Sequence, residues 1–371
     1  MLALGACGVS DAFAQAKLKN YETRYYVFHT DLEKNAVREA DARISAMAEM
    51  YYQRTKDFGG KITKKLPFYL FVDAADYYAA GGMPGSAGVF NGERLMAIAA
   101  PEYSSVVWHI VQHEGFHQFV HAVIGGDIPV WVNEGLAEYF GEAVFTGDGF
   151  INGLIPPKRL ARLQEWIRSG QAHTLEKMMT TSYAEWNMGL SAVNYDQAWS
   201  MVHFLAHAKN GRYSGPFNSF IRDVSRGMKY EHAWQKNFGA GTRDFEEQWR
   251  KYWLEMPQDA TESLYAKATA ATLTSFLARA VSQKQIFESF ASFQAAAEDG
   301  EVRQHAQDWL PPAMLQEAAQ KASHYGDWKI EKRAGRYHLV LTMTDGTIYD
   351  GAFQVRNSRV IPNSVKIIER K

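Results

Sequence analysis

The chain has 371 residues, of which 46% are hydrophobic and 22% charged, with 40 basic and 41 acidic side chains. This is the composition of an ordinary globular protein, and a net charge of −1 argues against a surface built to bind nucleic acid. No run of about 18 apolar residues occurs, so no transmembrane helix is expected. The single cysteine, Cys7, excludes an internal disulfide framework and a multi-cysteine metal cluster.

The first 16 residues have features of an export signal. They begin with a small apolar stretch, and the tripeptide A-F-A at 12–14 offers a cleavage site just before Lys17. The sequence L-G-A-C at 4–7 also resembles a bacterial lipoprotein box, in which Cys7 would carry a lipid anchor. We expect an exported protein of the periplasm or cell envelope, with cleavage favoured over lipidation. The alternative interpretation of this segment is a disordered tail.

After this segment, a small mixed sheet is expected. Segments rich in β-branched and aromatic residues predict its strands, and the dipeptide N-G at 91–92 predicts a hairpin turn. Asp31 is expected to cap a helix over 32–56, whose apolar side chains recur at helical spacing. Residues 77–86 indicate a loop, and Pro101 is expected to close the sheet. The predicted strands cover residues 25–29, 66–72, 89–90 and 95–99.

Residues 102–256 show the pattern of successive amphipathic helices, with no further strand expected. Pro257 marks the predicted end of this domain. Residues 261–322 then predict alanine-rich helices that are interrupted by the two prolines at 311–312. The last part alternates apolar and polar residues and predicts an antiparallel sheet with a D-G turn at 345–346. Its strands are expected at 328–330, 337–343, 347–355 and 360–368.

Residues 113–117 have the sequence H-E-G-F-H, which is the motif H-E-x-x-H, inside a helical pattern that ends at the glycines 125–126. Residues i and i+4 of a helix lie on one face, one turn apart. His113 and His117 can therefore both direct a ring nitrogen at one metal ion. Glu114 is rotated by about 100° from His113. Its carboxylate then lies beside the metal, where it can take a proton from water.

A third ligand is expected on a second helix, because a catalytic zinc ion needs three protein ligands and one open position. The segment N-E-G-L-A-E-Y-F begins 16 residues after His117 and is preceded by I-P-V-W at 128–131. Glu134 and Glu138 fall on one face of this helix because they are four residues apart.

H-E-x-x-H followed by N-E-G-x-A-E-Y resembles the gluzincin metallopeptidases, the group that includes thermolysin and aminopeptidase N. The segment at 128–140 is most similar to the bacterial peptidase-MA-like proteins, many of which are domains of unknown function. The resemblance covers roughly residues 22–225 and implies a zincin fold. It implies that Glu134 is the third zinc ligand and that Glu138 holds a ligand histidine by a hydrogen bond.

The resemblance also implies a group that stabilises the oxyanion formed when water attacks a carbonyl. In the aminopeptidase branch this group is a tyrosine that follows the third ligand, and here Tyr195 lies 61 residues beyond Glu134. Tyr195 opens a segment at 195–205, Y-x-x-A-W-x-x-V-x-F-L, that is similar to the peptidase-MA-like proteins. The alternative is a tyrosine packed at a helix start, with Tyr183 as the weaker candidate for the role.

Other histidines are interpreted as ordinary residues. His109 and His121 lie one turn on either side of the motif, and their spacing raises the question of a second metal ion. Ordinary residues on that helix face are the favoured interpretation. Structural or surface roles are expected for His29, His203 and His207.

The sequence predicts an α+β protein with two domains after the signal segment 1–16. Residues 17–257 are expected to form a zincin-like, thermolysin-like catalytic domain with a small mixed sheet and a helical subdomain. Residues 258–371 are expected to form a small helical and antiparallel-β domain. A G-x-M-E-N strand that would capture a peptide N-terminus is absent, which favours an endopeptidase.

The expected activity is zinc-dependent hydrolysis of a peptide or protein. His113, His117 and Glu134 hold Zn²⁺ in this prediction, Glu114 is the general base, and Tyr195 stabilises the oxyanion. Two alternatives stay open: a zinc-binding envelope assembly factor without peptidase activity, and a peptidase whose cleft is closed by its own C-terminal domain. The retained Glu114 favours an enzyme, because degenerate members usually lose this glutamate.

Overall fold

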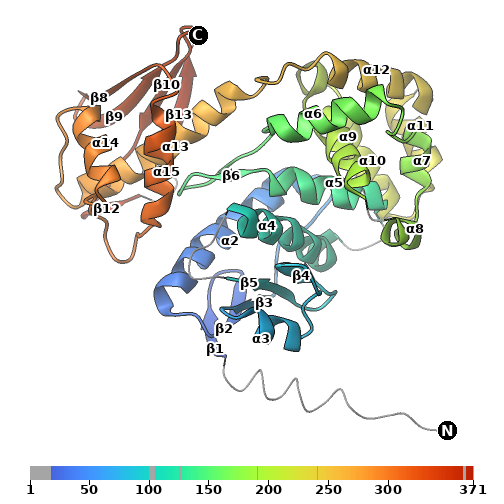
Figure 1. Ribbon diagram of the computed structural model, residues 1–371, viewed down its shortest axis with the longest axis horizontal. Coiled ribbons are helices and arrows are strands. Elements are labelled where there is room, and N and C mark those ends of the chain that lie inside the picture. Colours follow the sequence, from blue (N-terminus) through green and yellow to red (C-terminus); the bar gives the residue numbers. More distant parts are fainter. Residues whose placement is uncertain are drawn as a thin grey trace. The chain divides into compact units, whose positions relative to one another are not determined.

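The computed structural model describes residues 18–99, 105–124, 128–189, 191–239, 241–361 and 365–370. The predicted signal segment with Cys7, Pro101 and the glycines at 125–126 lie outside these ranges. Helices and strands both occur, and the strands gather in separate sheets, in agreement with the predicted α+β class (Figure 1). None of the described helices is both long and apolar enough to cross a membrane.

The chain folds into two compact units. Unit 1 consists of the described residues up to Val37, together with Met47–Ala143 and Ile155–Ala260. Unit 2 consists of Arg38–Ala46, Val144–Leu154 and Thr261–Lys371.

Unit 1 contains a five-stranded mixed sheet with the order β1-β2-β3-β5-β4. The central pairs β2–β3 and β3–β5 are parallel, whereas the outer pairs β1–β2 and β4–β5 are antiparallel. The four strands that were predicted here are confirmed, and β1 was not foreseen because its short sequence is mostly polar. The strands are β1 (Lys19–Glu22), β2 (Tyr26–Thr30), β3 (Leu66–Phe71), β4 (Gly88–Phe90) and β5 (Leu95–Ile98).

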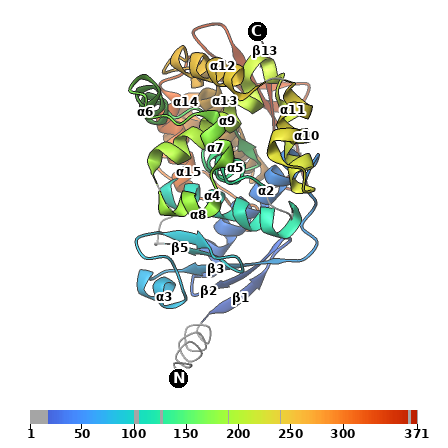
Figure 2. The ribbon, with the colours of Figure 1, turned by 90° about the vertical axis from the view of Figure 1, so that its right-hand side faces the viewer.

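Helices cover both faces of this sheet (Figure 2). On one face, Tyr69 and Met96 pack with Tyr77 of α3 (Ala74–Ala79). On the other face lie α4 (Ser105–Phe119) and the end of α2 (Lys34–Thr55), as Figures 1 and 2 both show.

Two sequence predictions in this region are wrong. Asp31 does not cap α2, whose N-cap position is held by Glu33 without a side-chain bond. Asp31 instead accepts a hydrogen bond from the backbone N of Val72 at 3.0 Å, so a tertiary contact takes the carboxylate that the local pattern assigned to a cap. The loop predicted at 77–86 begins with the last residues of α3, because Asp73 caps this short helix through the backbone N of Ala75 (2.6 Å) and the ring of Tyr77 is buried.

The remainder of unit 1 is helical. The long helix α9 runs through its centre and is buried along most of its length, with Trp199 packing 5.1 Å from Trp253 between ring centroids. The helices that surround the site are η1 (Val120–Ile124, a π-helix), α5 (Val130–Gly141), α6 (Pro157–Arg168), α7 (Leu175–Thr180), α8 (Tyr183–Met188) and α9 (Ala192–Gly211). Three more complete the unit: α10 (Ser214–Ser225), α11 (Tyr230–Phe238) and α12 (Thr242–Leu254).

Unit 2 combines three helices with a four-stranded antiparallel sheet of order β13-β10-β9-β8. Gly351 of this sheet lies so close to α13 that a Cβ atom there would be 2.1 Å from Oγ1 of Thr274. The predicted hairpin at 345–346 is confirmed, with Gly346 at a φ of 84°. The elements are α13 (Glu262–Ser282), α14 (Phe290–Glu298), α15 (Pro312–Ala322), β8 (Asp327–Arg333), β9 (Arg336–Thr342), β10 (Ile348–Ala352) and β13 (Lys366–Arg370).

Unit 2 also contains two small two-stranded ribbons. One of them pairs β11 (Val355–Arg356) with β12 (Arg359–Val360). The other pairs β6 (Val144–Phe145) with β7 (Phe150–Ile151) and corrects the prediction that no strand occurs between 102 and 256. Strands of two residues are too short to show an alternating pattern in the sequence.

Candidate metal centre

The H-E-x-x-H motif lies on α4 and faces α5. The Nε2 atoms of His113 and His117 are 3.1 Å apart, and Oε2 of Glu134 lies 3.4 Å from each of them. A tetrahedral zinc ion with ligands at about 2.0–2.1 Å needs ligand atoms about 3.3 Å apart. The three residues are thus brought together as a group that could hold one metal ion, and their nitrogen and oxygen donors suit zinc.

Side chains of α4 tie this helix to α5 and thereby fix the distance between the ligands. Gln112 precedes His113 and donates through Nε2 to the backbone O of Phe140 at 2.9 Å and of Gly141 and Ala143 at 3.0 Å. Phe140 and Gly141 end α5 and Ala143 follows it, and carbonyls in the last turn of a helix lack the usual i+4 partners. The buried amide of Gln112 on α4 therefore hydrogen-bonds the carbonyls at the end of α5, the helix that carries Glu134.

Glycines in both motifs allow close helix packing. A Cβ atom on Gly115 would be 2.7 Å from Cε of Met47, and one on Gly135 would be 2.5 Å from the backbone O of Ala198. The absence of a side chain at Gly115 therefore lets α2 pack closely against α4. In the same way, Gly135 lets α9 pack closely against α5. The second approach brings the helix that carries Tyr195 beside the helix that carries Glu134.

The charges at the site are strongly coupled. Burial disfavours the charged form of His113, but hydrogen bonds to Glu134 and Glu138 outweigh it and raise its pKa to about 10. Burial likewise disfavours the charged form of Glu134, but the adjacent His117 and His113 lower its pKa to about 2. Without a metal ion, a proton on His113 therefore supplies the positive charge that Glu134 and Glu138 attract, and a metal ion has to displace that proton.

Glu138 lies where it can orient the first histidine. Its Oε1 is 3.1 Å from Nδ1 of His113, and the side chain is buried. A proton on Nδ1 that is held by Glu138 leaves Nε2 free to face Glu134 and His117.

Glu114 points toward the edge of the sheet in unit 1. Its Oε2 accepts a hydrogen bond of 2.8 Å from the backbone N of Phe90, in the edge strand β4. The side chain is partly buried. The residue expected to be the general base is therefore held by the strand nearest the motif helix.

Tyr195 lies beside the histidines, in the first turn of α9. The centroid of its ring is 6.3 Å from that of His113 and 5.3 Å from that of Trp186 on α8. Burial raises the pKa of Tyr195, so its hydroxyl stays protonated and able to donate a hydrogen bond at neutral pH. The weaker candidate, Tyr183, donates instead to the backbone O of Ile128 at 3.3 Å.

A second group of possible ligands consists of His109, Glu138 and Glu142. The guanidinium of Arg159 already lies among them, donating to Glu138 and, at 2.6 Å, to Glu142. In this second group, Arg159 therefore supplies the positive charge that a metal ion would otherwise supply. His121 does not join it, because its side chain is exposed and its ring lies 5.7 Å from that of Phe90.

Sequence reasoning did not identify Arg159. Its one local signal is a basic residue beside the buried positions Leu160, Leu163 and Ile167 of the amphipathic helix α6. Such a position indicates a buried cation that needs acidic partners, but the pattern does not say which partners these are.

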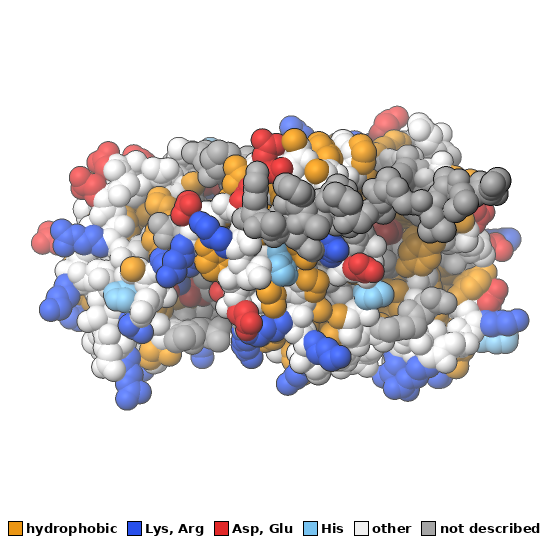
Figure 3. Space-filling model, turned by 90° about the horizontal axis from the view of Figure 1, so that it is seen from below, with side chains coloured by type: hydrophobic (Ala, Val, Ile, Leu, Met, Phe, Trp, Pro, Cys, Tyr) orange, Lys and Arg blue, Asp and Glu red, His pale blue; other side chains and the backbone are white. Residues whose placement is uncertain are grey.

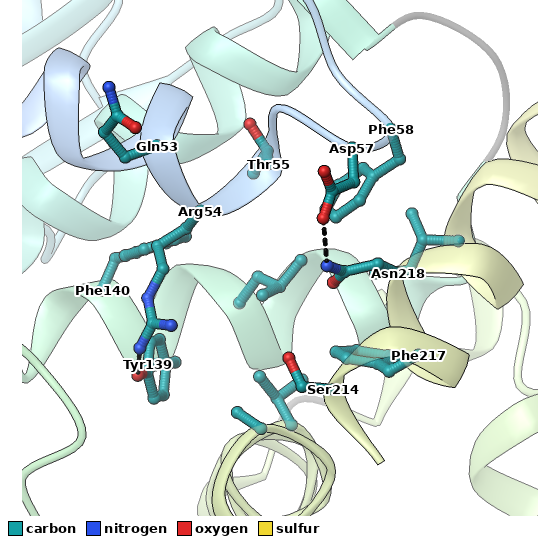
Figure 4. A pocket seen from close by; sticks show the side chains of 14 residues that line it. Gln53, Arg54, Thr55, Asp57, Phe58, Tyr139, Phe140, Ser214, Phe217 and Asn218 are labelled. Carbon is teal, nitrogen blue, oxygen red and sulfur yellow. Dashed lines mark hydrogen bonds between the residues drawn. The ribbon is translucent and has the colours of Figure 1, made fainter. Parts of the chain in front are cut away.

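A cavity of about 230 Å³ is lined by Leu136, Tyr139 and Phe140 of α5, which by helical spacing face away from Glu134 and Glu138. Figure 4 shows the side chains around it. The ends of α2 and α5 meet α9 and α10 around it. Arg54 donates to the hydroxyl of Tyr139 at 2.7 Å, and Asn218 donates to Asp57 at 2.9 Å across its rim. None of the three candidate ligands lines it, so it is separate from the metal centre.

On the face of the molecule shown in Figure 3, the described basic and acidic side chains are interspersed among apolar ones. This mixture agrees with the near-neutral net charge of the chain.

The described residues thus define a candidate metal centre of the H-E-x-x-H type between two helices, in an α+β protein. Residues 108–231 match the model of a family described as "Protein of unknown function (DUF1570)". The matched segment runs from the second turn of α4 to the start of α11 and contains all of the candidate site residues on these helices. No curated protein matches the chain.

Proposed function

We propose that this chain is a zinc-dependent metallopeptidase of the gluzincin type, with a zincin-like unit 1, that cleaves peptide bonds in a peptide or protein. The observation that carries the proposal is the convergence of two Nε2 atoms and one carboxylate oxygen within 3.4 Å of one another, on helices that also supply Glu114. A catalytic zinc site needs these three ligands and a fourth, open position.

His113, His117 and Glu134 would hold the ion, and Glu138 keeps Nε2 of His113 directed at it through the contact with Nδ1. Zn²⁺ supplies a Lewis acid that polarises the scissile carbonyl and makes water more acidic. Glu114 takes a proton from the attacking water and delivers it to the leaving amine. The hydroxyl of Tyr195 donates a hydrogen bond to the oxyanion that develops on the carbonyl oxygen.

The edge strand β4 fits a role beside this chemistry. Among the described strands, Gly88–Phe90 pair only with β5, so a substrate in extended conformation could add to the other edge by displacing the side-chain bonds of Ser86 and Glu114 there. The amide of Phe90 on this strand also holds Glu114, which links the proposed substrate edge to the proposed base.

The proposal includes export. Residues 1–16 carry the A-x-A site and the alternative lipid attachment site Cys7, so the substrate would be outside the cytoplasm. N-terminal sequencing of the protein recovered from the cell envelope tests this part: a new N-terminus near Lys17 or at a modified Cys7 supports it, and an intact Met1 contradicts it.

Activity is tested on residues 17–371 with a mixed peptide library. We expect cleavage by the zinc-loaded wild type and a loss on the order of 10²–10⁴-fold in kcat/KM for Glu114→Gln, as for removal of a general base. Zinc content should stay at one ion per chain in this variant. Glu165→Gln, an exposed glutamate on α6, is the matched control and should cleave like the wild type.

Equal cleavage by the Glu114→Gln variant would contradict the assigned base. One bound zinc ion with no cleavage by either protein would favour the zinc-binding assembly factor or the autoinhibited enzyme. Truncation near Pro257, which removes only the C-terminal segment of unit 2, separates those two, because only an autoinhibited enzyme gains activity from it.

A further inference from the structure

Arg159 is the centre of a buried charge network behind the candidate metal centre. Its side chain is only 9% exposed and contacts three carboxylates on two other helices. It donates to Glu138 and Glu142 of α5, the latter at 2.6 Å, and through Nε to Asp196 of α9 at 2.5 Å. A guanidinium serves all three because its five N–H donors lie in a fixed planar fork.

Glu138 connects this guanidinium to a candidate zinc ligand. One of its carboxylate oxygens contacts Arg159, and the other lies 3.1 Å from Nδ1 of His113. The direction of the His113 ring therefore depends on a carboxylate whose own direction is set by Arg159.

Asp196 connects the same guanidinium to the helix of the candidate oxyanion donor. It is almost fully buried and directly follows Tyr195 in the first turn of α9. Arg162, which is half exposed, also contacts Asp196 at 3.0 Å, but among the described residues its hydrogen bonds go to Asp196 and not to Glu138. Arg159 alone of the two arginines links α5 to α9 through side-chain bonds among the described residues.

We propose that Arg159 is a positioning residue for the metal centre, which fixes His113 through Glu138 and the first turn of α9 through Asp196. The inference rests on the proposed zinc site. Two effects of replacing Arg159 oppose each other. Loss of its positive charge should tighten zinc binding, because the cation repels Zn²⁺. Loss of its positioning role should weaken zinc binding, and we expect this second effect to dominate.

The test measures the zinc dissociation constant of the full chain by competition with a chromophoric chelator. We expect Arg159→Met to bind zinc about 10–100-fold more weakly, the range found when partners of metal ligands are removed. Arg159→Lys keeps the charge and protects the fold, but a single ammonium cannot bridge Glu138 and Asp196 at once. Its affinity should fall between those of the wild type and of Arg159→Met.

Arg162→Met is the matched control, because it removes an arginine one turn away that contacts Asp196 only. Its zinc affinity should stay within about threefold of the wild type, since ion pairs of exposed side chains contribute little. Cobalt substitution supplies a second readout: the visible spectrum of bound Co²⁺ reports ligand geometry and should change in Arg159→Met but not in Arg162→Met.

A double variant identifies the route. If Arg159 acts on His113 through Glu138, then adding Arg159→Met to Glu138→Gln should weaken zinc binding far less than it does in the wild type. Full additivity of the two changes would overturn that route.

The outcomes separate this inference from the proposed function. A folded wild type that binds no zinc contradicts both. In another outcome, the wild type binds zinc while Arg159→Lys and a folded Arg159→Met bind it equally well or more tightly, with an unchanged cobalt spectrum. That result contradicts the role of Arg159 but leaves the proposed function standing.

Discussion

Two groups of charged or metal-ligating side chains differ in whether an arginine lies among them: Asp148 and Asp308 in unit 2, and His113, His117 and Glu134 in unit 1. In unit 2, Arg279 donates to Asp308 at 2.8 Å and to Asp148 at 3.2 Å, and its side chain is 5% exposed. In unit 1, Arg159 completes a similar cluster, yet the atoms of His113, His117 and Glu134 converge beside it without an arginine or lysine among them in the described residues. Burial of charge therefore does not mark a site by itself. What indicates a candidate metal site is a set of ligand atoms that lie close together with no arginine or lysine of the protein between them.

The largest expected effect is on stability, from the completed cluster of unit 2. Arg279→Met should lower the free energy of unfolding by about 3–5 kcal/mol, because it leaves the partly buried carboxylates of Asp148 and Asp308 without their buried cation. Zinc affinity should be unchanged. Denaturant titration and chelator competition measure the two effects, and a loss of stability below about 1 kcal/mol would remove the distinction between the clusters.

The next effect is on metal binding. If about 10–16 kcal/mol of zinc affinity is shared among four ligands, each contributes about 3 kcal/mol, so His117→Ala should weaken zinc binding on the order of a hundredfold or more. His121→Ala, one turn further along the chain and exposed, is the control and should bind one zinc ion like the wild type. Equal affinities in the two variants would contradict the ligand assignment.

A smaller effect is expected where α5 and α9 meet. Gly135→Ala should destabilise the protein by about 1–3 kcal/mol, because the added methyl group would lie 2.5 Å from the backbone O of Ala198. Gly215→Ala in α10 is the matched control, since nothing lies within 4 Å of a Cβ atom there. Thermal unfolding compares them; a Gly135→Ala variant as stable as Gly215→Ala would show that the two helices have room to separate.

The smallest effect is a pH dependence in unit 1. Burial and the charge of Arg54 lower the pKa of His207 from 6.5 to about 4, while Tyr139 and His203 also face its ring. Between these pH values the unfolded chain binds a proton that the folded chain excludes, so stability falls as the pH falls through this window. His207→Gln should lose less stability than the wild type between pH 7 and pH 5 in denaturant titrations. If the wild type and His207→Gln lose the same free energy of unfolding between pH 7 and pH 5, other groups cause the pH dependence.

The sequence predicts those parts of the fold and site that depend on local spacing. The candidate ligands His113 and His117 are four residues apart on one helix, so periodicity alone places both on one face. The strands β2 and β3 are rich in aromatic or β-branched residues and β5 is a short apolar run, so the sequence indicates them as well.

The remainder depends on contacts between distant segments. The bond from Arg159 to Glu138 spans 21 residues, and the bond from Asp31 to Val72 spans 41, so neither leaves a periodic trace. Asp31 has the local appearance of a helix cap, but its carboxylate accepts a hydrogen bond from Val72, just after β3, instead. Of the two missed contacts, only that of Arg159 with Glu138 lies beside the predicted ligands.

The most direct test of the central claim is zinc K-edge X-ray absorption, with metal analysis, on the reconstituted full chain and on Glu134→Gln. We predict one zinc ion per chain, with two imidazole nitrogens and oxygen ligands at about 2.0–2.2 Å in the wild type, and a changed oxygen shell with weaker binding in the variant. A folded wild type without zinc, or a zinc spectrum with no imidazole contribution, would contradict the assignment of His113, His117 and Glu134.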